Sequence, residues 1–171
     1  EPHLNRDALV VLDLESGKER NLATATNPFA LTQPAWSPER KRIAVIQFQG
    51  GVSFPASVIT IRVSDGKREP VGKAAFLNME DLTWLPDGSG LIAAAFDPST
   101  FTGNQLWRIG YPDGRITRIT SDANEYGELT VSADGSTIAA VRIRRQPDLW
   151  VAAASGPRNL KQITFGSGEE G

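Results

Sequence analysis

Side chains that could carry out covalent or acid–base chemistry are scarce in this 171-residue sequence. It contains one histidine, His3, and no cysteine. An enzyme site needs a nucleophile, a base and a group that orients the base, and the scattered carboxylates and serines form no such arrangement. The absence of cysteine also removes thiolate metal sites and disulfides. We therefore expect no catalytic residues, no metal ligands and no cofactor.

Four aspartates are each followed directly by a glycine, which invites comparison with calcium-binding loops: Asp65, Asp87, Asp113 and Asp134. Calcium sites need several oxygen ligands from one loop, and none of these pairs has a second acidic residue at ligand spacing. Aspartate accepts backbone hydrogen bonds in turns, and glycine adopts positive φ without strain. We interpret the four pairs as tight turns.

Two kinds of hairpin alternate along the chain. The A–B hairpin starts at Trp36, Trp84 or Val131, which lie 48 and 47 residues apart, and its second strand is small and apolar. The C–D hairpin is an apolar strand, a glycine turn and a polar return strand, and it recurs at 8–22, 58–71, 105–119 and 148–163. The chain reads C–D and then A–B–C–D three times, which predicts fourteen strands.

A four-stranded unit that repeats every 40–50 residues indicates the blades of a β-propeller. We predict an all-β fold, a β-propeller fragment of about three and a half four-stranded antiparallel blades. Residues 1–171 form one partial propeller, with a half blade at 1–33 and blades at 34–80, 81–127 and 128–171.

The pattern within each blade predicts which strands are buried. The B strands at 92–95 and 138–141 are continuously apolar, as expected of strands covered on both faces. The D strand at 115–118 alternates and carries charge, as expected at a sheet edge. The tryptophans recur at equivalent positions, which favours packing between blades over a ligand platform: Trp36, Trp84, Trp107 and Trp150.

Four segments are similar to known repeats: 106–114, 118–122, 129–135 and 148–151. They resemble the TolB-like or WD40-like (PD40-type) propeller repeat, most closely the repeats C-terminal to bacterial serine/threonine receptor kinases. The resemblance covers about residues 8–165 and implies a periplasmic or extracytoplasmic location. The same blades occur in the N-terminal propellers of prolyl-oligopeptidase-like peptidases. The sequence lacks the Gly-His and Trp-Asp signatures of eukaryotic WD40 repeats, the kinase motifs and the Gly-x-Ser-x-Gly elbow.

An arc of three and a half blades does not close, because propellers have roughly four to eight blades. Each end would expose an apolar blade face, which soluble monomers rarely tolerate. The chain is therefore predicted to be a fragment of a larger bacterial protein, a homodimer that pairs its open ends, or an arc that closes irregularly. In isolation we expect self-association through the open blade faces.

Loops at one face of a rigid scaffold commonly carry binding function. The predicted B–C loops are 49–57, 97–104 and 144–147, and the D–A loops are 23–33, 72–80 and 121–127. Five aromatic residues in these loops are expected to be exposed: Phe29, Phe54, Phe76, Phe101 and Tyr126.

Aromatic and arginine side chains together are typical of interface hot spots. Arg144 and Arg145 add a basic spot to the same face. We predict that this face binds a protein or peptide through Phe54, Phe101, Tyr126, Arg144 and Arg145.

Two functions remain open. The first is a non-catalytic protein- or ligand-binding or sensor module. The second is the substrate-gating propeller of a prolyl-oligopeptidase-like serine peptidase whose catalytic domain lies outside this sequence. The net charge of −2 is spread without a basic stripe, so nucleic acid is not expected as a partner. No apolar run reaches 18 residues, so this segment is not expected to contact a membrane.

Overall fold

The computed structural model describes residues 6–50, 55–96, 103–144, 150–152 and 161–163. These ranges contain strands and turns and no helix. The strands, in chain order, are β1 (Arg6–Leu12), β2 (Glu19–Thr26), β3 (Phe29–Trp36), β4 (Arg42–Gln49), β5 (Ala56–Arg62), β6 (Arg68–Phe76), β7 (Met79–Trp84), β8 (Gly90–Phe96), β9 (Asn104–Gly110), β10 (Ile116–Arg118), β11 (Glu125–Val131), β12 (Ile138–Ile143), β13 (Trp150–Val151) and β14 (Lys161–Gln162).

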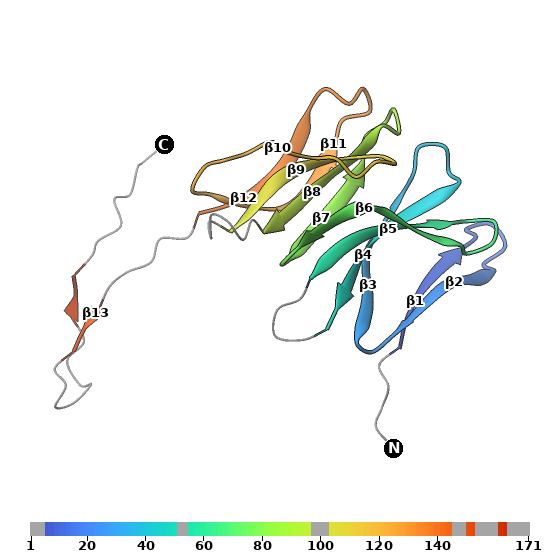
Figure 1. Cartoon of the computed structure of the whole chain (residues 1–171), viewed down its shortest axis with the longest axis horizontal. Coiled ribbons are helices and arrows are strands. Elements are labelled where there is room, and N and C mark those ends of the chain that lie inside the picture. Colours follow the sequence, from blue (N-terminus) through green and yellow to red (C-terminus); the bar gives the residue numbers. More distant parts are fainter. Residues whose placement is uncertain (1–5, 51–54, 97–102, 145–149, 153–160, 164–171) are drawn as a thin grey trace, which may run out of the picture.

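Two complete four-stranded blades form the centre of the molecule. The first blade has the order β3-β4-β5-β6 and the second has β7-β8-β9-β10, with every neighbouring pair antiparallel. The half blade β1–β2 lies beside the first blade, and the β11–β12 hairpin lies beside the second (Figure 1). The predicted all-β propeller fragment is confirmed.

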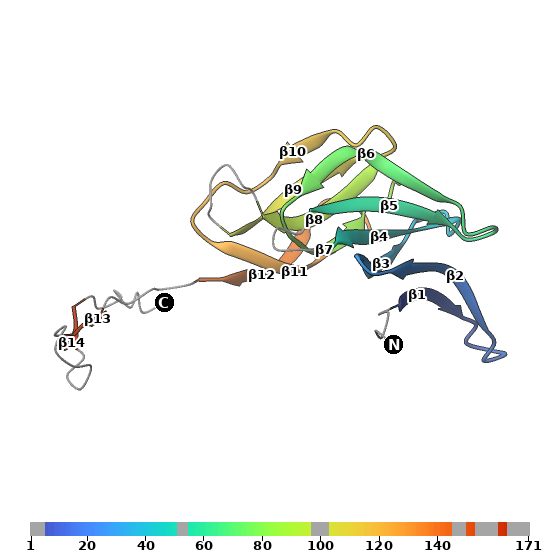
Figure 2. The same cartoon turned by 60° about the horizontal axis from the view of Figure 1, so that its bottom comes forward.

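The last four strands form two separate sheets. β11 pairs with β12, and β13 pairs with β14. Both views place the β13–β14 hairpin away from the blades (Figures 1 and 2). A single four-stranded blade over 128–171 therefore stays a prediction.

The B strands of the two complete blades are the centre of the core. Residues 90–95 of β8 are all buried, as their apolar run predicts. The same expectation is wrong for β12, where residues 141–143 are exposed. The reason is the position of β12, because its outer side carries no blade among the described residues.

Glycines allow the second blade to approach the first closely. The C–D turn of the second blade meets β6, where Gly114 (φ +69°) lies against Gly72 (φ +65°). A Cβ atom at Gly72 would lie 2.6 Å from the Cα atom of Gly114. Real Cβ atoms do not approach this closely, so both positions require glycine.

Two tryptophans pack between blades as predicted. Trp84 is buried, and its Nε1 donates a hydrogen bond to the carbonyl oxygen of Ala35 in the neighbouring blade at 3.1 Å. The rings of Trp107 and of Phe76 in the neighbouring blade pack in a T-shaped arrangement, with centroids 5.6 Å apart. These aromatic contacts hold the first and second blades together.

The same prediction is wrong for Trp36 and Trp150, which are 50% and 54% exposed. Trp36 occupies the position of Trp84, but the neighbouring half blade consists of β1 and β2 and offers no inner strand in the described chain. Trp150 belongs to the separate β13–β14 hairpin.

Each inner strand carries an irregularity at an equivalent place. The register shifts between Thr32 and Ala35 in β3, between Met79 and Asp81 in β7, and between Gly127 and Leu129 in β11. The polar side chains at these bulges are exposed: Gln33, Glu80 and Glu128.

Hydrogen bonds near the bulges link the inner strands of adjacent blades. The Nε2 of Gln33 donates to the carbonyl oxygen of Glu80 at 2.7 Å. The backbone amide of Leu129 donates to Oδ2 of Asp81, also at 2.7 Å. The bulges therefore help to fix neighbouring blades against each other.

Candidate functional site

The predicted partner-binding residues fall into two groups. Phe54, Phe101 and Arg145 lie outside the described residues. Tyr126 lies in β11 opposite Arg142 of β12, and the exposed Arg144 follows the end of β12. The structure thus brings Tyr126 and Arg144 to the same end of one hairpin.

Tyr126 is oriented by a carboxylate. Its hydroxyl donates to Oδ2 of Asp122 at 2.7 Å, and the backbone amide of Asn124 donates to Oδ1 of the same residue at 2.9 Å. The bond from Tyr126, followed by that from Asn124, lowers the pKa of Asp122, and the bond to Asp122 raises the pKa of Tyr126. Asp122 is thus ionised and Tyr126 protonated at neutral pH, so the pair is an oriented contact and not an acid–base pair.

A buried glutamine holds the connection between β10 and β11 in place. Nε2 of Gln105 donates to the carbonyl oxygen of Asn124 at 2.7 Å, and its Oε1 accepts from Oγ1 of Thr120 at 2.9 Å. Oγ1 of Thr120 also accepts from the amide of Leu106 at 2.9 Å. A satisfied buried network of this kind rigidifies its surroundings. Gln105 is not among the residues predicted from the sequence, although a polar residue at the start of an apolar strand is a usable signal.

Asn104 adds a buried donor next to this network. The residue is 2% exposed, and its Nδ2 has no hydrogen-bond acceptor in the described part of the chain. Asn104 pairs with Phe96 at the loop end of β8 and β9. An unsatisfied buried donor is unusual and calls for an explanation, and this one lies beside the predicted binding face.

The D–A loops of the first two blade junctions are shorter than predicted. Strands β2 and β3 occupy most of 23–33, and strands β6 and β7 occupy most of 72–80. Phe76 was expected to be exposed, but it pairs with Ala56 in the β5–β6 ladder and is buried against Trp107. The β5–β6 ladder continues to Phe76, so most of the loop predicted at 72–80 is strand.

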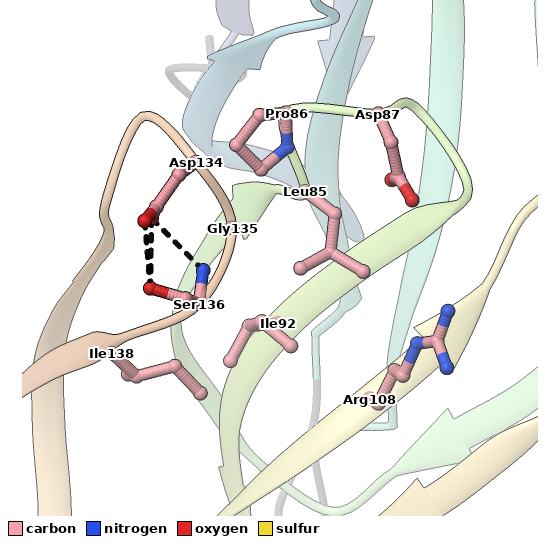
Figure 3. Close-up of a pocket in the computed structure, with 9 residues that line it drawn as sticks. All are labelled: Leu85, Pro86, Asp87, Ile92, Arg108, Asp134, Gly135, Ser136 and Ile138. Carbon is pink, nitrogen blue, oxygen red and sulfur yellow. Dashed lines mark hydrogen bonds between the residues drawn. The ribbon is translucent and has the colours of Figure 1, made fainter.

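A cleft of about 370 Å³ lies at the opposite end of the strands, between the second blade and the β11–β12 hairpin (Figure 3). Its size falls in the range of small-ligand pockets. Leu85, Ile92 and Ile138 form its apolar part, and Asp87, Arg108 and Asp134 supply charge. The remaining lining residues are Pro86, Gly135 and Ser136.

The carboxylates of the cleft are held by their own turns. Asp134 accepts hydrogen bonds from Oγ of Ser132 at 2.5 Å and from the amide of Ser136 at 3.0 Å, which lower its pKa to about 2. The amide of Ser89 donates to Asp87 at 2.9 Å and lowers the pKa of that carboxyl. Both groups are therefore ionised at neutral pH and serve as turn anchors.

Arg108 is the cation of the cleft, and its Nη2 donates to Oγ of Ser89 at 3.1 Å.

In the described ranges no three His, Asp or Glu side chains gather in a group that could hold a metal ion. The same ranges contain no helix with the length and apolarity needed to cross a membrane.

Comparison with known proteins places the chain among β-propellers. No family model matches it. It is 27% identical over 128 residues to dipeptidyl-peptidase 5 of Porphyromonas gingivalis, a match that covers 74% of this chain and 18% of that protein. The chain thus spans less than a fifth of this curated relative.

Solved structures show the same fold at low sequence identity. TolB from Acinetobacter baumannii matches with a TM-score of 0.63 and 18% identity, over 91% of this chain and 34% of that one. A prolyl endopeptidase matches with a TM-score of 0.60 and 18% identity, over 97% of this chain and 27% of that one. The described residues therefore have the fold of part of a β-propeller, similar to those in TolB and in the prolyl endopeptidase.

Proposed function

We propose that this chain is a non-catalytic binding module that recognises a protein or peptide partner through its loop face. The observation that carries the proposal is the buried Gln105 network, which holds the β10–β11 connection and so orients Tyr126. Interfaces gain affinity when their aromatic and arginine side chains are held in place before binding. Phe54, Phe101 and Arg145 belong to the same proposed surface together with Tyr126 and Arg144.

The test is selection of ligands for the 171-residue chain from a library of random peptides, followed by affinity measurement on variants. Tyr126→Ala and Arg144→Ala should each weaken binding of a selected peptide by about tenfold or more. Arg115→Ala is the matched control, because Arg115 is an exposed arginine at the other end of the strands. Equal affinities for all four proteins would overturn the assignment of this face.

A second candidate is the substrate-gating propeller of a prolyl-oligopeptidase-like serine peptidase. The match to dipeptidyl-peptidase 5 and the likeness to a prolyl endopeptidase favour it. The coding sequence on either side of these residues separates the two candidates. A downstream serine hydrolase domain supports the peptidase, whereas an upstream kinase domain with a membrane-spanning helix supports a sensor in a receptor kinase.

The open ends of the arc support self-association of the 171-residue polypeptide. Large apolar side chains are exposed on the half blade and on the β11–β12 hairpin, among them Val10, Leu12, Val141 and Ile143. Exposed apolar groups gathered at a sheet face are typical of interaction surfaces. The proposed contact joins the open end of one copy to the opposite end of a second.

A further inference from the structure

The cleft in Figure 3 lies at a blade junction that is equivalent to the one at which Trp84 packs one blade earlier. Between the first and second blades the ring of Trp84 is buried, with Nε1 donating to the carbonyl oxygen of Ala35 at 3.1 Å. The ring of Tyr111 packs against it edge to face, with centroids 5.0 Å apart. Both rings belong to the second blade, and Trp84 reaches the first blade through its bond to Ala35.

The β11–β12 hairpin repeats the geometry of β7–β8 but carries a smaller residue. Val131 pairs with Ile138 in β11–β12 as Trp84 pairs with Leu91 in β7–β8. β11 packs against β7, β8 and β9, just as β7 packs against β3 and β4. Valine therefore stands where the repeat has tryptophan, and Ile138 beside it lines the cleft.

We propose that this cleft binds an aromatic side chain, tryptophan above all, of a polypeptide partner. Leu85, Ile92 and Ile138 supply the apolar contact surface for the ring. Thr83 pairs with Ile92 as Ala35 pairs with Ala44, so the carbonyl of Thr83 is the counterpart of the acceptor for Trp84. The aromatic ring of the partner would thus make the same kind of contact that Trp84 makes with Ala35 inside the chain.

The charges around the cleft restrict the sequence of the partner. Asp87 and Asp134 are ionised, and Arg108 is the single cation in the lining, which leaves a net negative rim. Like charges across a contact disfavour binding. The preferred partner segment therefore places neutral or basic residues next to its aromatic residue. This site is separate from the loop face and does not depend on its function.

The test uses the full chain and two blocked peptides, acetyl-Lys-Trp-Lys-amide and acetyl-Lys-Leu-Lys-amide. Binding is followed by NMR through the methyl signals of Leu85, Ile92 and Ile138. The tryptophan peptide should shift these signals saturably and bind about tenfold more tightly than the leucine peptide, since aromatic contacts dominate small interfaces. Equal affinity of the two peptides, or shifts confined to other residues, would overturn the proposal.

Variants of the protein separate this cleft from unspecific binding. Val131→Trp should fill the cleft with an internal ring and weaken binding of the tryptophan peptide by about tenfold or more. Ile138→Ser, a change at a half-buried position, should weaken it by about fivefold and provides a second readout if the larger side chain impairs folding. Lys18→Ala, at an exposed position in the β1–β2 turn, is the control and should bind normally. Undiminished binding by the folded Val131→Trp and Ile138→Ser proteins would contradict the proposal.

Discussion

At the scale of single residues, Trp84 and Trp36 show how the surroundings of a tryptophan determine its contribution to the stability of the fold. They begin equivalent turns, yet Trp84 is 6% exposed and hydrogen-bonded to Ala35, whereas Trp36 is 50% exposed. Trp84→Phe should lower the free energy of unfolding by about 1–2 kcal/mol, because it removes the indole donor and part of a buried ring. Trp36→Phe, the matched control, should change it by less than about 0.5 kcal/mol. Urea denaturation of both variants tests this, and equal effects would contradict the inter-blade role of Trp84.

The turn anchor Asp134 predicts a dependence of stability on pH. Hydrogen bonds from Ser132 and Ser136 lower its pKa from 3.8 to about 2 in the folded chain. Since the folded pKa is the lower one, the stabilisation is complete above the unfolded pKa and is lost as pH falls from about 4 to about 2. Asp134→Asn should therefore show a shallower loss of stability over this interval. Urea denaturation at a series of pH values measures the slope, and an unchanged slope would refute the prediction.

At the scale of elements, the contact between Gly114 and Gly72 sets how closely the second blade approaches the first. A Cβ at Gly114 would lie 2.8 Å from the carbonyl oxygen of Val71 and 2.8 Å from the nitrogen of Gly72. Gly114→Ala should therefore cost about 2–3 kcal/mol through positive φ and steric overlap. Gly17 has a similar φ of +67° but no atom near its added Cβ, so Gly17→Ala should cost only about 1 kcal/mol. Thermal or urea unfolding compares the two variants. Equal losses of unfolding free energy would mean that the Gly114–Gly72 contact does not contribute to stability.

The order and type of the strands were predictable because local residues specify them. The Asp87-Gly88 turn and the apolar run of β8 mark a hairpin and a buried strand without reference to the rest of the chain. Features that depend on distant residues were not predictable. Phe76 is buried because the β5–β6 ladder continues to it, and residues 141–143 of β12 are exposed because no blade covers their outer side in the part of the chain that the structure describes.

The candidate sites were harder to predict than the fold because they also depend on residues that are distant in the sequence. Tyr126 could be selected from residue type and loop position, but its orientation depends on Asp122 and on the distant Gln105. The cleft is lined by the turn after β7, by β8 and β9, and by the β11–β12 turn, and the sequence alone does not show that these segments lie together.

At the scale of the whole molecule, the two unfinished sheets have complementary edges. In both complete blades the B strand pairs with the C strand in one register, with Val45 opposite Ile59 and Ala93 opposite Trp107. β12 is a B strand and β1 a C strand, and neither edge is paired further in the described chain. The same register would place Ala140 of one copy opposite Val10 of a second copy.

This pairing predicts a specific covalent dimer. Because the chain has no cysteine, a protein with Val10→Cys and Ala140→Cys should form a disulfide-linked dimer on mild oxidation. The control protein carries Val10→Cys and Ile138→Cys. Ile138 lies two residues from Ala140 on the same face of β12, so this pair should crosslink much less. Light scattering of the unmodified chain should show a dimer at micromolar concentration. A stable monomer there would contradict self-association, and equal crosslinking of the two pairs would contradict the register.

The bulges in β3, β7 and β11 also bear on aggregation. Each of these strands lies at the inner edge of its sheet, where unpaired amides and carbonyls can template the addition of a foreign strand. A bulge interrupts the regular spacing of these groups and turns the backbone away from a flat ladder. The exposed polar side chains Gln33, Glu80 and Glu128 stand at the interruptions. The inner edges are thereby protected against amyloid-like stacking even while the arc is open.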